Sequence, residues 1–403
     1  MDLRSDRPFW PTTCRRPRFD RASSRAIRVD ALIVGAGITG ALVAYELSKA
    51  GASVAIIDHR PPGSGSTAAS TALLQYEIDT PLVKLKRKLG ARHAGAAYTA
   101  SYTAIHNMQL LARELARDIE LVPRLSLHLA VKRADIAEFR KEVGARQALN
   151  IPVELLSNRA LKARFGLDRP GAILSEDALE VNPLKLTYAL LQSALACGVT
   201  MLPRSPVDLH NLVNRARPLR IDLPRARRIT ATRVVIATGY ETPEQFGAIA
   251  ALTELRSTYA LVTAPLGKRP WPGHALLWDS GDPYFYARTT VDGRIMMGGE
   301  DEPFTTAAER DALIAPKSRA LMKKLRELVP GLRARPAFRW AGTFAQTEDG
   351  LPYIGEHPRW PGVLFALGYG GNGITFSLIA AQIIAAAVAG KPHPWARLFK
   401  FDR

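Results

Sequence analysis

The segment from Val29 to Asp58 constrains the fold of this chain more than any other stretch. It reads as a buried strand (29–34), a glycine-rich turn, a helix (about 38–50), a glycine at the helix exit and a second strand that ends at Asp58. This order is that of a βαβ unit, in which two parallel strands are joined by a helix. The segment therefore predicts a doubly wound, Rossmann-like α/β domain.

Three glycines, Gly35, Gly37 and Gly40, give the turn its GxGxxG spacing. The first permits the tight turn, the second lets the backbone approach a phosphate, and the third lets helix and strand pack closely. The amides of the first helical turn offer partial positive charge to an anion. Asp58 lies 18 residues beyond Gly40, where a carboxylate can accept both hydroxyls of an unphosphorylated ribose. These residues predict a dinucleotide site, but they do not distinguish NAD from FAD.

Two later stretches favour FAD. "VVIATGY", from Val234 to Tyr240, is a buried strand that ends in small residues, as a close approach to a second part of the same cofactor requires. "GYGGNGI" then opens a helix with Gly370, Gly371 and Gly373. The positive end of that helix would stabilise the negative charge of reduced flavin. Two glycine-led helices at opposite ends of the chain suit a long, two-headed cofactor.

Composition excludes some classes of protein and leaves one question open. The 403 residues suffice for a large core and two lobes, and 47% hydrophobic residues argue against disorder. The formal charge of +18 is compatible with nucleic-acid binding, but no binding signature accompanies it, so a solvated basic surface is the favoured explanation. Residues 1–28 carry eight Arg against three Asp, so we expect a basic arm ahead of a folded pattern that begins at Val29.

The remaining features predict a cytoplasmic protein without a transmembrane segment. The arm lacks the apolar core of a secretion signal, and Cys14 and Cys197 are too few for a disulfide framework or a metal site, so no metal is expected. The apolar stretch from Ile374 is too short to span a bilayer and predicts a buried core helix.

Periodicity predicts the other elements. Helices are expected over about 82–118, 134–148, 182–196 and 306–328. The first should bury one face formed by four apolar residues, Ala104, Met108, Leu111 and Leu115. Strands should dominate the region from about 253 to 300.

The stretches "VGAGITGALVAYELSKAG", "ATG" and "WAGTFAQTEDGLPYIG…GYGGNGI" together resemble the D-amino-acid oxidase, or glycine/sarcosine oxidase, family of FAD-dependent oxidoreductases. The loop "GSGSTAASTALLQYEID" is similar to that of a bacterial subgroup whose substrates are mostly inferred, and some members of which carry a Rieske domain. The resemblance implies a Rossmann-like FAD-binding domain interleaved with a second α+β substrate domain on a mostly antiparallel sheet. We expect residues 29–80, 150–250 and 340–395 in the first and 81–149 and 251–339 in the second.

The resemblance also implies which residues meet FAD. Those expected to contact the cofactor are Gly35, Ala36, Gly37, Ile38, Thr39, Gly40, Asp58, His59, Arg60, Ser66, Thr67, Ala68, Ala69, Ser70, Val207, Thr238, Gly239, Gly370, Gly371, Asn372, Gly373 and Ile374. In sarcosine oxidases a Cys before the "DG" pair bonds the flavin covalently, and Gly342 stands at that position here. The Ser66–Ser70 loop also lacks the anchoring His of dimethylglycine-type dehydrogenases. FAD should therefore be bound non-covalently.

A second departure from the family concerns the substrate. Glycine oxidases carry, two residues after the "WAG"-type glycine, an Arg that binds the substrate carboxylate, and this chain has Phe344 there. Either another cation takes over, with Arg288 and then Arg256 as candidates, or the substrate is an amine without a carboxylate. Tyr369, just before the flavin-edge glycines, is a candidate to hydrogen-bond the substrate.

The sequence thus predicts an FAD-dependent oxidoreductase that oxidises a C–N bond of an amine or amino acid. A hydride would pass to flavin N5 and leave an imine that hydrolyses. The expected partners are this small substrate and O2 or another electron acceptor, with no nucleic acid. Two alternatives stay open: a dehydrogenase that passes electrons to a quinone or carrier protein, and a non-catalytic FAD-binding regulator.

Overall fold

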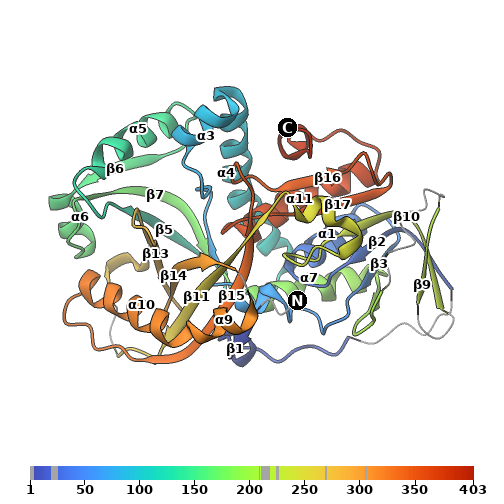
Figure 1. Ribbon diagram of the computed structural model, residues 1–403, viewed down its shortest axis with the longest axis horizontal. Coiled ribbons are helices and arrows are strands. Elements are labelled where there is room, and N and C mark those ends of the chain that lie inside the picture. Colours follow the sequence, from blue (N-terminus) through green and yellow to red (C-terminus); the bar gives the residue numbers. More distant parts are fainter. Residues whose placement is uncertain are drawn as a thin grey trace.

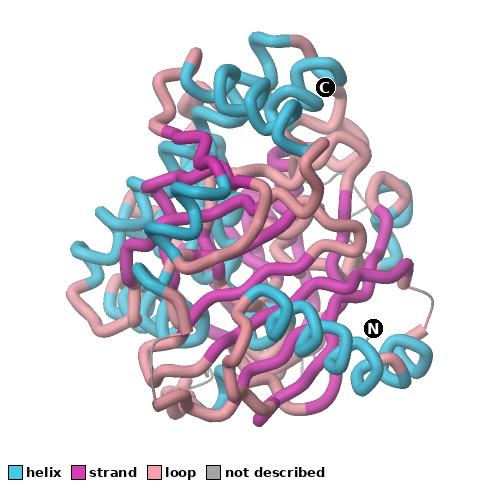
Figure 2. The backbone as a smooth tube through the Cα atoms, turned by 90° about the vertical axis from the view of Figure 1, so that its left-hand side faces the viewer, coloured by secondary structure: helices cyan, strands magenta, loops and turns pink. Residues whose placement is uncertain are grey.

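The chain forms two β-sheets that lie side by side, each with its own helices (Figure 1). The structure is a computed structural model that describes residues 4–19, 26–207, 209, 218–223, 227–267, 270–304 and 306–403. In the perpendicular view of Figure 2, strands run through the middle of the molecule and helices lie toward its outside. The mixed α/β architecture predicted from the sequence is confirmed.

The smaller sheet is the predicted Rossmann-like one. Its order is β16, β17, β10, β2, β3, β8, with β9 added along β10. Strands β17, β10, β2, β3 and β8 run parallel, and β16 and β9 are antiparallel additions. Strands β3 and β17 are buried along their whole length, as expected for strands covered on both faces. The strands are β2 (Ala26–Val34), β3 (Val54–Ile57), β8 (Thr200–Leu202), β9 (Leu219–Leu223), β10 (Arg227–Ile236), β16 (Tyr353–Glu356) and β17 (Val363–Leu367).

Three helices form a packed group against this sheet. α1 (Ile38–Lys49) follows the glycine turn and packs against both α7 (Pro183–Ala196) and α11 (Gly373–Val388). Asn182 caps α7 as predicted, since its side chain accepts from the backbone N–H groups of Leu184 and Lys185. The stretch from Ile374 is the buried helix α11, as predicted. The short helix α8 (Gly247–Ala250) comes after β10 in the chain.

The larger sheet has ten strands in the described part of the chain and is mostly antiparallel, as the family resemblance implied. Its order is β1, β15, β11, β14, β13, β12, β5, β7, β4, with β6 also paired to β7. Only the β12–β5 pair is parallel among the pairs that the structure describes. The strands are β1 (Arg4–Asp6), β4 (Leu73–Leu74), β5 (Val122–Leu129), β6 (Val153–Ser157), β7 (Gly171–Glu180), β11 (Glu254–Thr263), β12 (Leu276–Asp279), β13 (Phe285–Thr289), β14 (Ile295–Pro303) and β15 (Pro336–Gln346).

The other helices surround this larger sheet, and two predicted helices are each divided. The helix expected over 82–118 breaks at Gly90, whose φ of +81° ends α3 and starts α4. The helix expected over 306–328 is interrupted at Leu313. The helices are α3 (Leu82–Leu89), α4 (Ala91–Leu115), α5 (Asp135–Gln147), α6 (Asn158–Phe165), α9 (Ala307–Ala312) and α10 (Ile314–Leu328).

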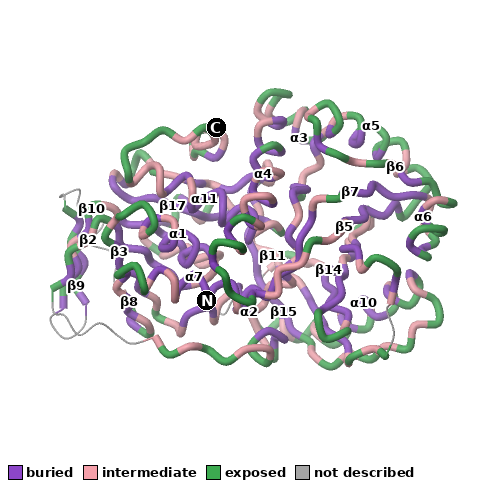
Figure 3. Tube along the Cα trace, turned by 180° about the vertical axis from the view of Figure 1, so that it is seen from behind, coloured by how far each residue is buried: buried purple, intermediate pink, exposed green. Residues whose placement is uncertain are grey.

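Buried residues run continuously from one lobe to the other, and exposed residues concentrate on outer loops and helices (Figure 3). The four residues predicted to share one face of α4, Ala104, Met108, Leu111 and Leu115, are all buried. They belong to a core cluster that also includes residues of α1, α7 and α11. One core cluster therefore spans both lobes, and separate clusters lie within each of them.

The expectation that the folded pattern begins only at Val29 is wrong. Arg4–Asp6 forms β1, which pairs with β15 at the edge of the larger sheet. Trp10 is only 1% exposed and donates its indole N–H to the carbonyl of Ser70 at 2.6 Å. Periodicity could not reveal this because a three-residue edge strand and one buried ring carry no repeat.

The boundary predicted at residue 150 also differs from the sheet membership. Strands β6 and β7, within 153–180, were expected in the FAD-binding domain but belong to the larger sheet. They pair with β5, and β7 also pairs with β4. Apolar strands of either sheet look alike in sequence, so only the pairing decides to which sheet a strand belongs.

Across the described residues, no helix combines the length and the apolar character that crossing a membrane requires. The same residues contain no cluster of His, Cys, Asp or Glu arranged to hold a metal ion. Cys14 and Cys197 are free thiols.

Candidate active site

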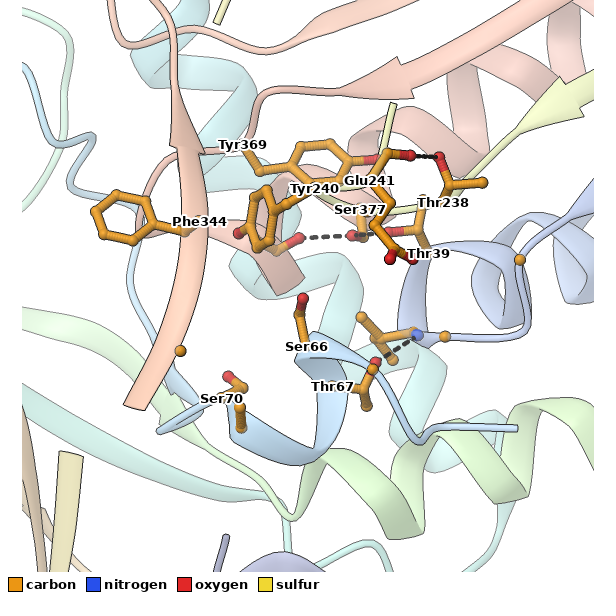
Figure 4. A pocket seen from close by; sticks show the side chains of 18 of the residues that line it. Thr39, Ser66, Thr67, Ser70, Thr238, Tyr240, Glu241, Phe344, Tyr369 and Ser377 are labelled. Carbon is orange, nitrogen blue, oxygen red and sulfur yellow. Dashed lines mark hydrogen bonds between the residues drawn. The ribbon is translucent and has the colours of Figure 1, made fainter. Parts of the chain in front are cut away.

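A cavity of about 880 Å³ is lined by residues of both sheets. One part is formed by the turn after β2, the loop after β3 and the end of β10, and another by the segment before α11. The rest is formed by β11, β12, β13 and β15 of the larger sheet. The cavity therefore joins the two glycine-led helix starts that the sequence placed more than 300 residues apart (Figure 4).

Gly35 and Gly40 have the packing roles predicted for them, and the approach of Gly37 to a phosphate stays a prediction. Gly35 has φ +113°, and a Cβ there would lie 2.3 Å from the carbonyl oxygen of Ala237. A Cβ on Gly40 would lie 1.9 Å from the carbonyl oxygen of Gly35, so the helix can approach the strand only with glycine at this position. Gly37 is less constrained, because its Cβ would meet only the Thr67 hydroxyl at 3.2 Å.

Asp58 lies beside this turn at the end of β3. Its Oδ2 accepts the N–H of Ala36 at 2.7 Å, and its Oδ1 accepts the N–H of Arg60 at 2.7 Å. Burial raises the pKa of Asp58, and the two backbone donors oppose that rise. The carboxylate lines the cavity where the predicted ribose contact requires an acceptor.

The hydroxyl-rich loop forms a short helix, α2 (Ser66–Ala69), on the other side of the turn. Thr67 accepts the backbone N–H of Ile38 at 3.0 Å and so ties the loop to the start of α1 (Figure 4). Arg60 lines the cavity, but both of its terminal nitrogens donate to Glu241 at 2.7 Å. Sequence reasoning missed Glu241, since nothing in the spacing brings it to Arg60.

The second glycine-led helix start closes the cavity from the opposite side. The hydroxyls of Thr39 in α1 and Ser377 in α11 lie 2.8 Å apart and join the two helices (Figure 4). Tyr240 donates its hydroxyl to the carbonyl of Gly370 at 3.1 Å. Asn372 donates to the carbonyl of Glu77, which fixes the turn that precedes α11.

Most of the residues expected to contact the cofactor line the cavity. Ala36, Gly40 and Ala68 are the exceptions: they are buried behind the lining and support it. Val207 lines the cavity and is half-buried, and its predicted contact with adenine stays a prediction.

The part of the cavity formed by the larger sheet is aromatic. Trp278, Tyr284, Tyr286 and Phe344 line it, and Phe344 is 8% exposed. Burial raises the pKa of Tyr286 to about 12, so its phenol keeps its proton at neutral pH. Gly342, at the position of the covalent Cys of sarcosine oxidases, also lines the cavity.

Tyr369 and Arg288 are placed differently from each other. Tyr369 lines the cavity, and its ring extends toward Thr39 and Ser377 (Figure 4). Burial raises its pKa, which keeps the phenol protonated. Its predicted role toward the substrate stays a prediction.

Arg288 does not line the cavity, which is a correction to its candidacy as a carboxylate clamp. It donates to the carbonyls of Ala72 at 3.1 Å and Val181 at 3.4 Å, and it lies 4.0 Å from Glu180. Burial lowers its pKa to about 10. The second candidate, Arg256, does not line the cavity either and pairs with Glu254 at 3.4 Å. The alternation of polar and apolar residues along a strand could not show which face of the sheet each arginine side chain occupies.

Asp79 is a cavity residue that sequence reasoning did not single out. Its Oδ2 accepts the N–H of Gly371 at 2.8 Å, so the carboxylate lies against the turn before α11. Burial raises its pKa, and the Gly371 donor opposes the rise. The only signal in the sequence is an acidic residue in the "QYEID" stretch, to which no spacing rule applies.

Comparison with known proteins agrees with this geometry. A family model described as FAD dependent oxidoreductase matches residues 30–387. Glycine oxidase of Bacillus licheniformis is 25% identical over 394 residues, which cover 93% of this chain and 98% of that protein. A putative Rieske 2Fe-2S iron-sulfur protein of Bacillus subtilis (strain 168) is 23% identical over 98% of this chain and 75% of that protein. The crystal structure of glycine oxidase from Geobacillus kaustophilus superposes with a TM-score of 0.75 at 23% identity, over 94% of this chain and 99% of that one.

Proposed function

This chain belongs to the family of FAD dependent oxidoreductases, and on that premise we propose that its cavity oxidises the C–N bond of a small amine or amino acid. The observation that carries the proposal is the continuity of the cavity. It passes from the glycine turn and Asp58 to the turn before α11, and it continues into the aromatic part formed by the larger sheet. One long cofactor and one small substrate fit this arrangement.

The residues present fit a non-covalent FAD. The glycines at 35 and 40 leave the backbone open where any side chain would collide, and Asp58 offers a carboxylate at the ribose position. The first turn of α11, which begins at Gly373, offers its positive end to the edge of the flavin. Gly342 provides no thiol for a covalent link.

FAD, when bound, supplies the acceptor for a hydride from the carbon beside the amine nitrogen. The chain's own contribution is to hold that carbon in place, to keep water away and to receive the amine unprotonated. The nitrogen gives its proton to water, and the resulting imine hydrolyses to a carbonyl compound and an amine or ammonia. Phe344 is buried and Tyr286 is half-buried, and these two rings provide the apolar walls that positioning requires.

Anaerobic mixing tests this function. The purified protein should show the absorbance of oxidised flavin, and acid precipitation should release that flavin into the supernatant. Primary, secondary and N-methylated amines and matched amino acids are then mixed with the protein without oxygen. At least one compound should bleach the flavin. If none does while dithionite still bleaches it, the proposed reaction is wrong.

The electron acceptor is decided in the same experiment. Oxygen is admitted to one sample of substrate-reduced protein, and a soluble quinone is added to another. Reoxidation by oxygen within the turnover time identifies an oxidase. Reoxidation by the quinone alone identifies a dehydrogenase.

A further inference from the structure

The two ends of the cavity differ in the charged side chains that line them. Among the described residues, the only basic side chains that line it are His59 and Arg60, both in the loop after Asp58. Arg60 is paired with Glu241 there. In the part formed by the larger sheet and the segment before α3, the charged lining residues are Glu77 and Asp79. This part, the substrate end, has carboxylates and no cation of its own.

Nearby arginines do not reverse this balance. Arg256 and Arg310 lie on or beside the strands of the substrate end but do not line the cavity. Arg256 pairs with Glu254 at 3.4 Å, and Arg310 pairs with Asp311 at 2.8 Å. A carboxylate on the substrate would therefore find no unscreened partner, while Asp79 would repel it.

Asp79 is held at the substrate end by the turn before α11. Its Oδ2 accepts from Gly371 at 2.8 Å, and a Cβ on Gly370 would lie 2.5 Å from the same oxygen. A Cβ on Gly371 would lie 2.9 Å from Oδ1. The two glycines thus leave space that the carboxylate fills, and Asp79 remains open to the cavity.

Asp301 adds a second carboxylate behind the same walls, although it does not line the cavity itself. On β14 its neighbour Glu302 pairs with Lys317 on the opposite face, at 2.6 Å. Asp301 lies next to Tyr284 and Thr258, which line the cavity. Burial raises the pKa of Asp301 to about 6, and the charge of Asp79 contributes to that rise.

Two buried carboxylate oxygens here lack a hydrogen-bond partner among the described residues. They are Oδ1 of Asp301 and Oε2 of Glu77, of which only Glu77 lines the cavity. Glu77 is 5% exposed, and its other oxygen, Oε1, accepts from Ser175 at 2.7 Å and lies 3.5 Å from the buried Arg146. Carboxylate oxygens only accept hydrogen bonds when ionised. Buried acceptors without donors favour a ligand that brings several N–H groups, such as an alkylammonium ion.

We propose that the substrate is an amine with a second positively charged nitrogen and no carboxylate, such as a diamine, and that Asp79 holds the second charge while Asp301, behind Tyr284 and Thr258, adds negative charge to this end of the cavity. This inference rests on the proposed oxidation of a C–N bond in the same cavity. A carboxylate stabilises an ammonium ion and opposes its deprotonation. The nitrogen at Asp79 is therefore the one that stays protonated, and the C–N bond of the other nitrogen is oxidised.

Matched substrates test the proposal. α,ω-Diaminoalkanes of three to six carbons are compared with n-alkylamines and ω-amino acids of the same lengths. Stopped-flow bleaching of the flavin without oxygen gives an apparent Kd and a limiting rate for each compound. We expect the best diamine to exceed its monoamine at least about 10-fold in the ratio of limiting rate to Kd, with the amino acid below both. The difference should lie in Kd.

Three variants assign the effect to the carboxylates. Asp79→Asn should reduce the preference for diamine over monoamine about 10-fold or more. Asp301→Asn should reduce this preference less, because Asp301 does not line the cavity. Glu302→Gln removes the next carboxylate along β14, which lies on the other face of the sheet. This control variant should leave the preference for diamine over monoamine unchanged. Thermal shift with 1,4-diguanidinobutane, a dication without an oxidisable amine, provides a readout other than turnover. It should stabilise the wild type and not Asp79→Asn.

The outcomes separate this inference from the proposed function. Bleaching by monoamines or amino acids with no preference for diamines overturns the inference and leaves the C–N oxidation standing. A preference that survives in both Asp variants overturns the assignment to these residues. If no amine or amino acid bleaches the flavin, the proposed function itself fails. If an Asp variant does not fold, the thermal shift of the wild type with the dication still decides whether the site binds it.

Discussion

Replacing Asp301 by Asn should stabilise the protein at neutral pH, because the folded state keeps this carboxyl in surroundings that disfavour its charge. Burial raises its pKa from 3.8 to about 6. A group whose folded pKa is raised binds protons more tightly in the folded state. Ionising the Asp301 carboxyl therefore lowers the free energy of unfolding. This loss is absent below about pH 4, grows between about pH 4 and pH 6, and is complete above about pH 6.

The magnitude follows from the size of the shift. A rise of about two units corresponds to at most about 3 kcal/mol of free energy of unfolding at pH 7.5. For a chain of this length, that change raises Tm by about 3 to 4 °C. Asn keeps the shape of the side chain and removes the charge.

The assay is thermal unfolding of Asp301→Asn and wild type at pH 4.0 and pH 7.5 with saturating FAD. The variant should gain stability at pH 7.5 and differ little at pH 4.0. Glu302→Gln is the matched control and should lose stability slightly or not change, because it removes the partner of Lys317. A variant that is less stable than wild type at pH 7.5 would refute the reasoning, since it would show that the ionised carboxylate is stabilised by its surroundings.

Three further predictions follow from the packing. Gly40→Ala should abolish flavin absorbance in the purified protein, because the new Cβ would lie 1.9 Å from the carbonyl oxygen of Gly35. The control Gly144→Ala should retain the flavin absorbance, because no atom lies within 4 Å of a Cβ at that position. Phe344→Arg should increase the ratio of amino acid to amine turnover at least about 10-fold in the bleaching assay, by providing a carboxylate partner; an unchanged ratio would mean that this wall does not face the substrate. Trp10→Ala should lower the free energy of unfolding by about 3 to 5 kcal/mol in denaturant titration, and a loss below 1 kcal/mol would mean that this N-terminal segment is not held in the fold.

Local sequence was sufficient where one short segment determines its own conformation. The glycine turn, the start of α7 at Asn182 and the buried helix α11 are each predicted by spacing, capping or apolar content within about 20 residues. The same holds for the predicted cofactor segments, most of which line one cavity. Their chemistry depends on backbone geometry, which glycines specify directly.

Charge placement at the substrate end could not be predicted in this way. Arg288 is in the strand-rich region where a carboxylate clamp was expected, yet it is buried against the carbonyls of Ala72 and Val181. Asp79 carried no motif, yet its carboxylate lies on the turn before α11. Whether a side chain on a strand faces a cavity or a core depends on register, and a shift of one residue reverses it.

The sequence by itself determined the βαβ unit, the two glycine-led helix starts, the family and the absence of an Arg at Phe344. Only the tertiary structure decided that residues 4–6 add an edge strand to the larger sheet, that β6 and β7 belong to the same sheet, and that Asp79 lines the end of the cavity formed by this sheet. The physical reason is the range of the interactions. Turns and caps are set by neighbouring residues, whereas strand pairing and the desolvation of charges are set by residues far apart in the chain.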